Sequence, residues 1–256
     1  MLFRRKNAQR TWSLTRFASL VLSLLAAAFL VGMLGLFAWQ SLPIWNHEGS
    51  SNYLFGGEWF FRVEKFGILP MIYGSVIVAL IAVILAAPVG VAAAIFTAEY
   101  LPPKFRMAAK LLIELLAGVP SVIYGLLGFF ILRIWVYNLL EPLGIVSGDT
   151  LLTAGILLAI MILPTVMTLS EDALRGVPTS HRLASRALGL TKAETSIFVV
   201  VRQALPGIAA AILLGLGRAI GETIAVFLVV GRQDNQLPNS PLDFRPVIEA
   251  GQTLTS

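Results

Sequence analysis

Arg218 and Glu222 stand four residues apart inside an apolar run that extends from about Pro206 to Val230. A charged side chain near the centre of a membrane helix costs about 2.5 to 3.5 kcal/mol on insertion scales. If the run forms one helix, this spacing brings both side chains to the same face. The pair therefore predicts either a buried ion pair that sets helix packing or a polar pathway for a charged solute.

The elements that must position this pair are long apolar blocks. Of the 256 residues, 57% are hydrophobic and 13% are charged, and the mean hydropathy is +0.83. Apolar blocks of about 20 residues are long enough to cross a bilayer as helices. We expect an all-α integral membrane protein, a polytopic helical bundle whose five spans cover residues 17–39, 72–97, 111–136, 151–169 and 206–230.

The basic residues predict how the chain crosses the membrane. Lysine and arginine gather before the first block, between the second and third, and between the fourth and fifth. Under the positive-inside rule these segments are cytoplasmic. The topology accounts for the net charge of +5, so no nucleic-acid partner is expected. The predicted parts are a basic cytoplasmic amino terminus (1–16), a first span (17–39), an outer loop (40–71), a helical core (72–230) with a cytoplasmic loop (170–205), and a polar outer tail (231–256).

Two other classes of feature are disfavoured by the residues. A basic start followed by an apolar run is also the pattern of a signal peptide. The run is long for a signal core, and no small-x-small cleavage site follows Trp39 before the polar loop, so a membrane span is favoured. The chain has no cysteine and two isolated histidines, His47 and His181, so neither a disulfide framework nor a metal site is predicted.

The loop at 170–205 reads as two short helices. Thr179 or Ser180 is expected to cap a first helix that runs to about Leu188, with Gly189 in the left-handed position that stops it. Thr191 and Glu194 then match a capping box, in which each side chain satisfies a terminal backbone amide. A second helix is predicted from about Lys192 towards Gln203. Such a motif suits docking to a partner, although a plain amphipathic connector would show the same spacing.

Three stretches resemble a known family of ABC-importer permeases, the MetI-like inner membrane components. The cytoplasmic loop resembles their EAA loop, which docks on an ATPase subunit. Residues 114–125 and 217–223 resemble the third-span and fifth-span signatures of phosphate permeases. Residues 66–75 and 224–226 resemble the PstC type of phosphate permease more than its PstA-type partner. In the EAA-like loop the matching positions are Leu183, Ala184, Ser185, Gly189, Leu205 and Pro206.

The resemblance implies a transport subunit rather than an enzyme. It implies uptake of phosphate across the cytoplasmic (inner) membrane, with a PstA-type second permease, an ATPase dimer and an extracytoplasmic phosphate-binding protein as partners. No Walker-type phosphate loop occurs in this chain, so ATP and Mg²⁺ would be used by the ATPase and no cofactor is expected here. No residue is predicted to be catalytic.

Particular residues take roles from the same resemblance. Arg218 is expected in the substrate pathway, since its planar donors match the oxygens of an oxyanion. Glu222 is expected to hold the guanidinium when the pathway is empty. Gly217 and Gly221 form a Gly-x-x-x-Gly pattern suited to close helix packing. Gly118 and Pro120, in the expected third span, are also assigned to helix packing.

The chain departs from the family in three respects. Leu183 stands where the EAA loop usually has glutamate. Four extra residues lie between Gly189 and Pro206, close to one helical turn, so the second loop helix is expected to be a turn longer. The family has a sixth span, whereas this sequence stops at Ser256, so the expectation is five spans with a sixth missing and the carboxyl terminus outside.

Other functions compete with the phosphate permease. Within the transporter class they are the PstA-type partner or a permease for another oxyanion, such as phosphonate or sulfate. A permease that lacks its last span could instead be a non-transporting assembly or regulatory protein. An intramembrane enzyme acting on lipid phosphates would use Arg218 as a clamp and Glu222 as a base, but the sequence offers no nucleophile or metal cluster beside them.

Overall fold

The computed structural model describes residues 2–46, 50–60, 65–235, 237–238 and 245–255. The remaining positions (1, 47–49, 61–64, 236, 239–244 and 256), among them His47 and parts of the expected outer loop and tail, lie outside the described residues. The chain divides into two units, Met1–Tyr53 and Leu54–Ser256.

Where it is described, the first unit contains one long helix, α1 (Leu2–Asn46), and the first residues of α2 (Ser50–Phe55), which continues into the second unit. Its apolar part, Thr15–Pro43, has 29 residues and none of its side chains is buried. At about 1.5 Å per residue this part reaches about 44 Å, more than the roughly 30 Å of a hydrocarbon core. The expected first span at 17–39 lies within this segment, and its exposed, mainly apolar side chains are suited to lipid.

Within the described residues, five helices are long and apolar enough to span a membrane, as the sequence predicted. The chain is therefore a multi-pass membrane protein, and the helical fold class is confirmed. The bounds of the third and fifth spans differ from the expected 111–136 and 206–230. The observed segments are Thr15–Pro43, Leu69–Tyr100, Ser121–Leu140, Leu151–Arg175 and Lys192–Ile220.

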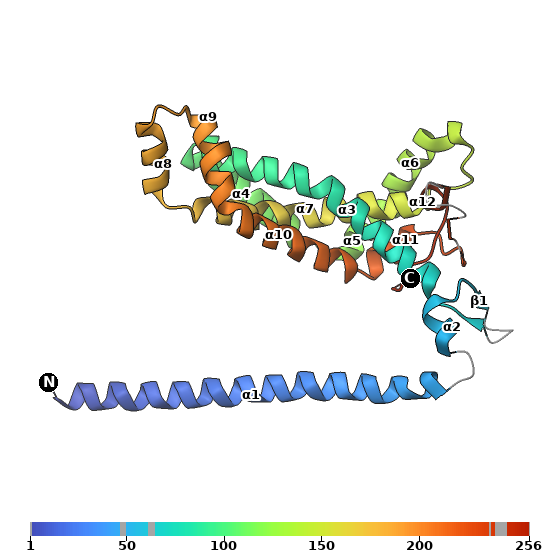
Figure 1. The fold of residues 1–256 in the computed structure, drawn as a ribbon, viewed down its shortest axis with the longest axis horizontal. Helices are drawn as coiled ribbons and strands as arrows, with labels where there is room; N and C mark the ends of the chain where they lie inside the picture. The colour runs from blue at the N-terminus through green and yellow to red at the C-terminus, as the bar shows by residue number, and fades with distance from the viewer. Residues whose placement is uncertain (1, 47–49, 61–64, 236, 239–244, 256) are drawn as a thin grey trace. The chain divides into compact units, whose positions relative to one another are not determined.

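Among the described residues of the second unit, the regular elements are helices and a short hairpin, joined by turns and irregular segments (Figure 1). The hairpin pairs β1 (Trp59–Phe60) with β2 (Lys65–Phe66) in antiparallel register. The helices in chain order are α2 (Ser50–Phe55), α3 (Leu69–Ile95), α4 (Pro103–Ala117), α5 (Ser121–Leu127), α6 (Arg133–Leu140), α7 (Leu151–Arg175), α8 (Thr179–Ala187), α9 (Lys192–Glu194), α10 (Arg202–Ile220), α11 (Ile224–Val229) and α12 (Arg245–Ile248). The π-helical segments η2 (Phe96–Tyr100), η3 (Gly128–Leu132) and η5 (Thr195–Val201), and the 3₁₀ turn η4 (Glu141–Leu143), extend them.

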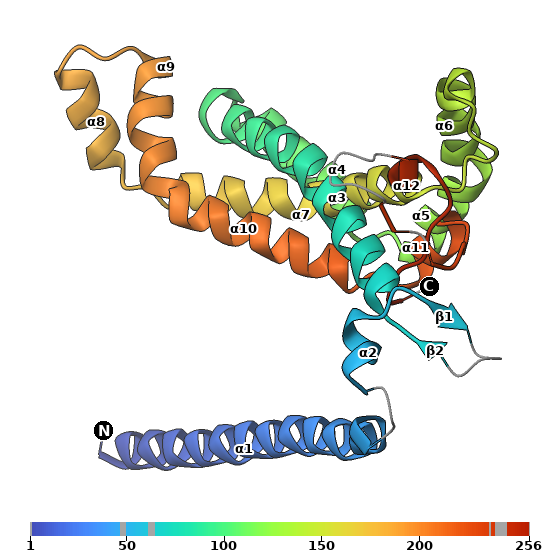
Figure 2. The same ribbon diagram turned by 45° about the vertical axis from the view of Figure 1, so that its right-hand side comes forward.

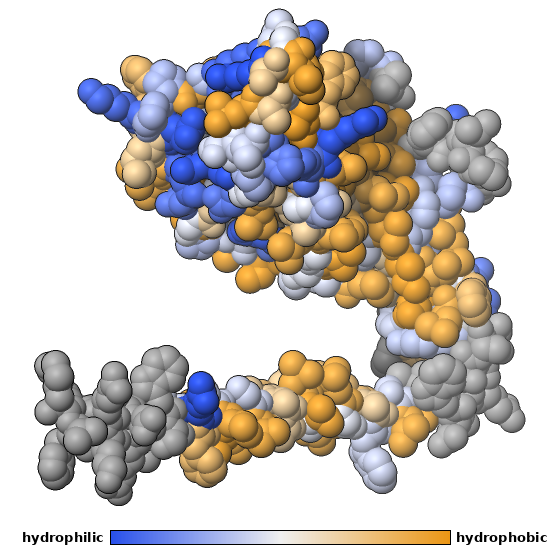
Figure 3. Space-filling view, turned by 60° about the vertical axis from the view of Figure 1, so that its left-hand side comes forward, coloured by the Kyte–Doolittle hydropathy of each residue, from blue (hydrophilic) through white to orange (hydrophobic). Residues whose placement is uncertain are grey.

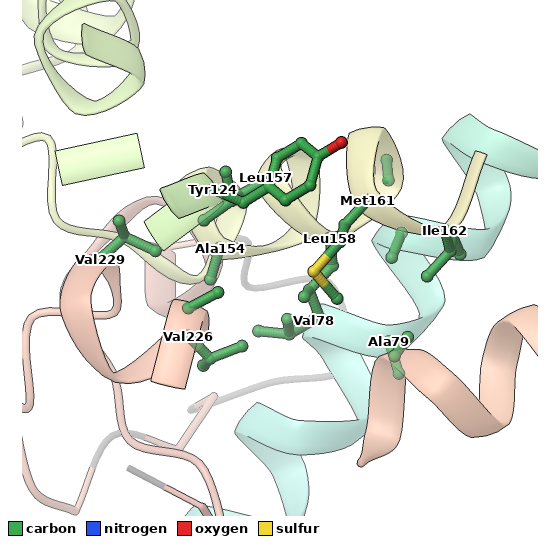
Figure 4. Close-up of a cluster of buried hydrophobic side chains, with 14 of the residues drawn as sticks. Val78, Ala79, Tyr124, Ala154, Leu157, Leu158, Met161, Ile162, Val226 and Val229 are labelled. Atoms are coloured by element: carbon green, nitrogen blue, oxygen red, sulfur yellow. The ribbon is translucent and has the colours of Figure 1, made fainter. Parts of the chain in front are cut away.

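Helix α7 is the centre of the bundle. Two-thirds of its apolar segment (67%) is buried, against 28% for the segment that contains α3 and 22% for the one that contains α10. It packs chiefly against α3 and α10, which run beside it in both ribbon views (Figures 1 and 2). The core joins Val78 of α3, Leu158 and Ile162 of α7, and Val226 of α11 (Figure 4). Any site on α10 is therefore positioned against α7.

Small residues bring α10 close to α7, but not at the expected positions. A Cβ atom added to Gly215 would lie 2.8 Å from Val166 Cγ2, and one added to Gly207 would lie 2.5 Å from Ala173 Cβ. By contrast, a Cβ on Gly217 would meet no atom within 4 Å, and one on Gly221 would meet only backbone oxygens of its own turn. The expected packing role of Gly217 and Gly221 is thus wrong for contacts within the described chain, because the face of α10 that meets α7 carries Gly207 and Gly215.

The two ends of the second unit differ. We call the end that carries α8 and α9 the loop end, and the end that carries α12 and residues 249–255 the tail end (Figures 1 and 2). Hydrophilic residues gather at the loop end, which is turned towards the viewer in Figure 3, with apolar surface beside them. At the tail end, Leu254 N donates to Ser75 Oγ over 2.9 Å, and Thr253 is buried. Where it is described, the expected polar tail therefore folds back onto α3.

Candidate functional site

The apolar run that carries Arg218 and Glu222 is not one helix. Helix α10 ends at Ile220 and α11 begins at Ile224, with a tight turn between them in which Glu222 N donates to Ala219 O over 3.3 Å. The expectation of a single helix over 206–230 is wrong at this point. Glycine disfavours a helix interior, and Gly221 occupies the position where α10 ends. Arg218 therefore lies in the last turn of α10, and Glu222 lies in the break.

Arg218 is held by a side chain from another helix. Its Nη1 donates a hydrogen bond to Thr165 Oγ1 of α7 over 3.0 Å. Thr165 follows Pro164, which is buried inside α7. The two partners are 53 positions apart in the chain, so the contact depends on how α10 packs against α7. Among the described residues no ion pair joins Arg218 to Glu222.

Glu222 stabilises the start of the next helix. Its Oε1 accepts a hydrogen bond from Ala225 N over 3.2 Å, and its backbone oxygen accepts one from Thr255 Oγ1 over 3.1 Å. A carboxylate near a helix amino terminus satisfies free amides and is favoured by the helix dipole. The expectation that Glu222 holds the guanidinium is therefore wrong in this structure, as is the alternative of a buried Arg218–Glu222 ion pair.

The chemistry available at Arg218 follows from its neutral partner. A guanidinium carries five N–H donors and a permanent positive charge. Thr165 takes one donor and supplies no negative charge, and it is the one hydrogen-bond partner of the guanidinium among the residues that the structure describes. Arg218 is only partly buried. Among the described residues no carboxylate pairs with this side chain, and its remaining N–H groups can bind an anion.

The EAA-like loop has the two helices that the sequence predicted. Helix α8 covers Thr179–Ala187, and Gly189 has a φ of +87°, the left-handed conformation expected of the residue that stops it. The capping box is also confirmed: Glu194 N donates to Thr191 Oγ1, and Thr191 N donates to Glu194 Oε2 over 2.8 Å. The first helix begins after Pro178, and neither Thr179 nor Ser180 caps it.

The loop residues assigned to ATPase coupling divide into two groups. On α8, the side chain of Leu183 is 66% exposed and that of Ser185 only 5%. Ala184 is exposed as well, so α8 presents Leu183 and Ala184 outwards while Ser185 packs inwards. Leu205 and Pro206 instead lie inside α10, because α9, η5 and α10 form one unbroken helix from Lys192 to Ile220. The expected extra turn belongs to this continuous helix.

Gly118 and Pro120 interrupt the third expected span. Helix α4 ends at Ala117 with Gly118 as its cap, and α5 starts after Pro120. Tyr124 Oη donates to Leu116 O over 2.8 Å across this break. A Cβ on Gly118 would touch only carbonyl oxygens of its own helix. These two residues therefore set a bend, since proline cannot continue the hydrogen-bond ladder and the preceding residue avoids helical backbone.

The partners that other helices supply to Arg218 and to the EAA-like loop were not predicted from the sequence. Thr165 binds Arg218, and Arg182 of α8 binds Glu99 at the end of η2, with 2.8 Å between Nη2 and Oε1. Thr165 is an ordinary threonine beside a proline in a span, and Glu99 and Arg182 are 83 positions apart. No local pattern marks such pairs, because the packing of helices brings them together.

The sequence matches known proteins along most of its length. The family described as binding-protein-dependent transport system inner membrane component matches residues 87–245. The chain is 41% identical over 179 residues to the probable ABC transporter permease protein YqgH of Bacillus subtilis, covering 70% of this chain and 57% of YqgH. It is 36% identical over 230 residues to the phosphate transport system permease protein PstC of Mesorhizobium japonicum, covering 80% of this chain and 69% of that protein.

A further relative extends the match. The phosphate transport system permease protein PstC of Haemophilus influenzae is 32% identical over 259 residues, covering 92% of this chain and 80% of the relative. The chain spans between 57% and 80% of the length of these three relatives. The resemblance found in the EAA-like loop and the two span signatures is thereby confirmed.

Proposed function

The chain belongs to the family of binding-protein-dependent transport system inner membrane components, and from this premise we propose that it is a permease subunit of an ATP-driven importer of inorganic phosphate. The names of two relatives support this substrate, since both are phosphate transport system permease proteins of the PstC type. The same names favour the PstC type over the PstA type.

One observation carries the proposal. Arg218 stands in an apolar span, and its one described hydrogen-bond partner is the neutral hydroxyl of Thr165. Charged groups inside a membrane bundle mark ion or substrate pathways when they are not consumed by an opposite charge. A guanidinium with spare donors can bind the oxygens of phosphate in a bidentate arrangement. Arg218 is therefore the proposed anion contact, with Thr165 instead of Glu222 as its holder.

The proposed assembly places an ATPase at the loop end. Helix α8 would dock on the ATPase through its exposed Leu183 and Ala184, with ATP and Mg²⁺ bound by that partner. The loop end and the amino terminus would then be cytoplasmic, in agreement with the positive-inside rule. A PstA-type permease and an extracytoplasmic phosphate-binding protein complete the importer in the cytoplasmic (inner) membrane.

The competing functions are weakened to different extents. An intramembrane enzyme would need Glu222 as a base beside Arg218, and the structure keeps Glu222 on the amino terminus of α11. A permease for another oxyanion would use the same arginine contact, because sulfate and phosphonates present the same kind of oxygen acceptors. Arg218 supports an anion as the substrate, and the choice of phosphate over other oxyanions depends on the names of the relatives.

The test is uptake by the whole importer. The chain, co-expressed with a PstA-type permease, an ATPase and a phosphate-binding protein of the same source, is reconstituted in vesicles, and ATP-dependent uptake of ³²P-phosphate is measured. Unlabelled sulfate, methylphosphonate and phosphate compete in separate samples. We expect uptake that needs ATP and is suppressed by unlabelled phosphate alone. Equal competition by sulfate or methylphosphonate would change the substrate, and failure of an ATPase to co-purify would refute the transport role.

A further inference from the structure

Arg182 joins the exposed helix α8 to two spans at the loop end. Its Nη2 contacts Glu99 Oε1 over 2.8 Å and donates to Leu174 O over 2.9 Å, while Nη1 donates to Val177 O over 2.5 Å. Glu99 lies at the end of η2, which continues α3, and Leu174 lies in the last turn of α7. We call Arg182, Glu99 and the two carbonyls the Arg182 cluster.

The Arg182 cluster is shielded from solvent. The side chain of Arg182 is 20% exposed and that of Glu99 is 10% exposed. Pairs of this kind differ from surface ion pairs, which contribute little, because removal of one partner leaves the other charge buried and unpaired. The Leu174 carbonyl lies in the last turn of α7 and the Val177 carbonyl in the link to α8, and the carboxyl end of a helix favours a nearby cation. Arg182 satisfies three groups at once.

A second buried contact joins α8 to the fifth span. Ser185 Oγ donates to Thr195 Oγ1 over 3.1 Å, and the two side chains are 5% and 2% exposed. Thr195 begins η5, which continues without a break into α10 and so towards Arg218. Helix α8 is therefore attached by Arg182 to the ends of α3 and α7, and by Ser185 to the segment that continues into α10.

The arrangement gives Arg182 a part that its neighbours on α8 lack. Leu183 and Ala184 face outwards, whereas Arg182 reaches back to the ends of the spans. We propose that Arg182 is a positioning residue that couples displacement of α8 to α3 and α7, so that ATP hydrolysis on a bound ATPase moves these spans together with α10. This inference rests on the proposed function, since it requires an ATPase docked on α8. Coupling of this kind must be measured as a change in one site caused by the other.

The experiment compares ATP hydrolysis with uptake in the reconstituted importer. The variants are Arg182→Ala, Arg182→Lys and Glu99→Gln, with Asp172→Asn as the matched control, because Asp172 also pairs with a cation near this end, but that cation is Lys110 of α4 (Nζ, 3.1 Å) and not a residue of α8. For Arg182→Ala we expect stimulation of ATP hydrolysis by the loaded binding protein to fall about tenfold, within the usual range for coupled sites. Unstimulated hydrolysis and the amount of bound ATPase should stay at wild-type levels.

The other variants separate coupling from folding. Arg182→Lys should recover part of the stimulation, because an ammonium can reach Glu99 but cannot also bond both carbonyls in the same fork. Arg182→Ala combined with Glu99→Ala should be no worse than Arg182→Ala alone, as expected of one shared interaction. If Arg182→Ala lowers the yield of the complex, Arg182→Lys and Glu99→Gln carry the test.

Two results would overturn the inference. One is wild-type stimulation in the Arg182 and Glu99 variants, and the other is loss of the ATPase from the complex in all of them, which would mean that the cluster only maintains the docking surface. The choice of phosphate as substrate is refuted by a different result. A wild-type importer whose ATP hydrolysis responds to its binding protein, but which takes up no phosphate, refutes phosphate and leaves the stimulation assay of Arg182 intact.

Discussion

Arg182 and Arg218 show two ways of placing an arginine in the same bundle. At the loop end, Arg182 contacts a carboxylate and two carbonyl oxygens, so its charge is paired and three of its N–H groups have acceptors in the protein. In the span, Arg218 meets one neutral hydroxyl. The first arrangement uses three of the five N–H donors of a guanidinium to join helices. The second keeps charge and donors available for a ligand.

The difference teaches which polar contacts hold the fold and which are free to act on a solute. A buried charge with a complete set of partners is expensive to break and favours one geometry. A charge held by a neutral group is oriented without being neutralised. The predictions that follow alter this balance at Arg218 or at the helix contact that positions it.

Removing the charge of Arg218 has the largest expected effect. Arg218→Gln should lower phosphate uptake by at least about 100-fold, since loss of one preorganised charged contact typically costs about 3 kcal/mol. Assembly should be unchanged, because only the bond to Thr165 is lost. Arg232→Gln is the control: Arg232 lies over the Phe227 ring at 4.1 Å, outside the proposed pathway. Near-normal uptake by an assembled Arg218→Gln importer would contradict the assignment.

Giving Arg218 a carboxylate partner should make it resemble Arg182. Thr165→Asp introduces a charge-assisted bond worth about 1.5 to 3 kcal/mol, so a competing anion should bind roughly 10- to 100-fold less well. We expect a higher Michaelis constant for uptake and unchanged or greater thermal stability. Thr165→Asn, which has nearly the same shape and no charge, should behave much more like the wild type. Equal uptake constants for the two variants would argue against an anion contact at Arg218.

Forcing α10 away from α7 should displace Arg218 from Thr165 and lower stability. Gly215→Val places atoms against Val166 and should cost about 1 to 3 kcal/mol through overpacking. Gly217→Val is the matched control, since its Cβ meets no atom of the chain within 4 Å. The melting temperatures of the two purified variants in detergent decide the question. A larger loss for Gly217→Val would show that the wrong face of α10 was assigned to this contact.

The smallest effect is expected at Glu222. Glu222→Ala removes the acceptor of Ala225 N and should cost about 0.5 to 1 kcal/mol, the range of a helix cap or dipole contact. Glu222→Gln retains an acceptor oxygen and should cost less. Uptake should change by no more than a few fold in either variant. If Glu222→Gln abolished uptake in an assembled importer, the carboxylate would have a role in transport beyond capping.

Features that arise within one segment were predictable from the residues. The five spans follow from the length of the apolar runs. The left-handed backbone at Gly189 follows from a glycine at the end of a short helix, and the capping box follows from the Thr191–Glu194 spacing. The helix break at Gly221–Thr223 was less accessible, because a glycine inside an apolar run is compatible with either a continuous helix or a turn. The error there led directly to the wrong pairing of Arg218 with Glu222.

The sequence by itself determined that the chain crosses the membrane, where its apolar segments lie and which family motifs it carries. Only the tertiary structure decided the partners of its charges: Thr165 for Arg218, the amino terminus of α11 for Glu222, and Glu99 for Arg182. The physical reason is the range of the forces involved. Hydropathy and capping act over a few neighbouring residues, whereas the partner of a side chain depends on which faces two packed helices present to each other.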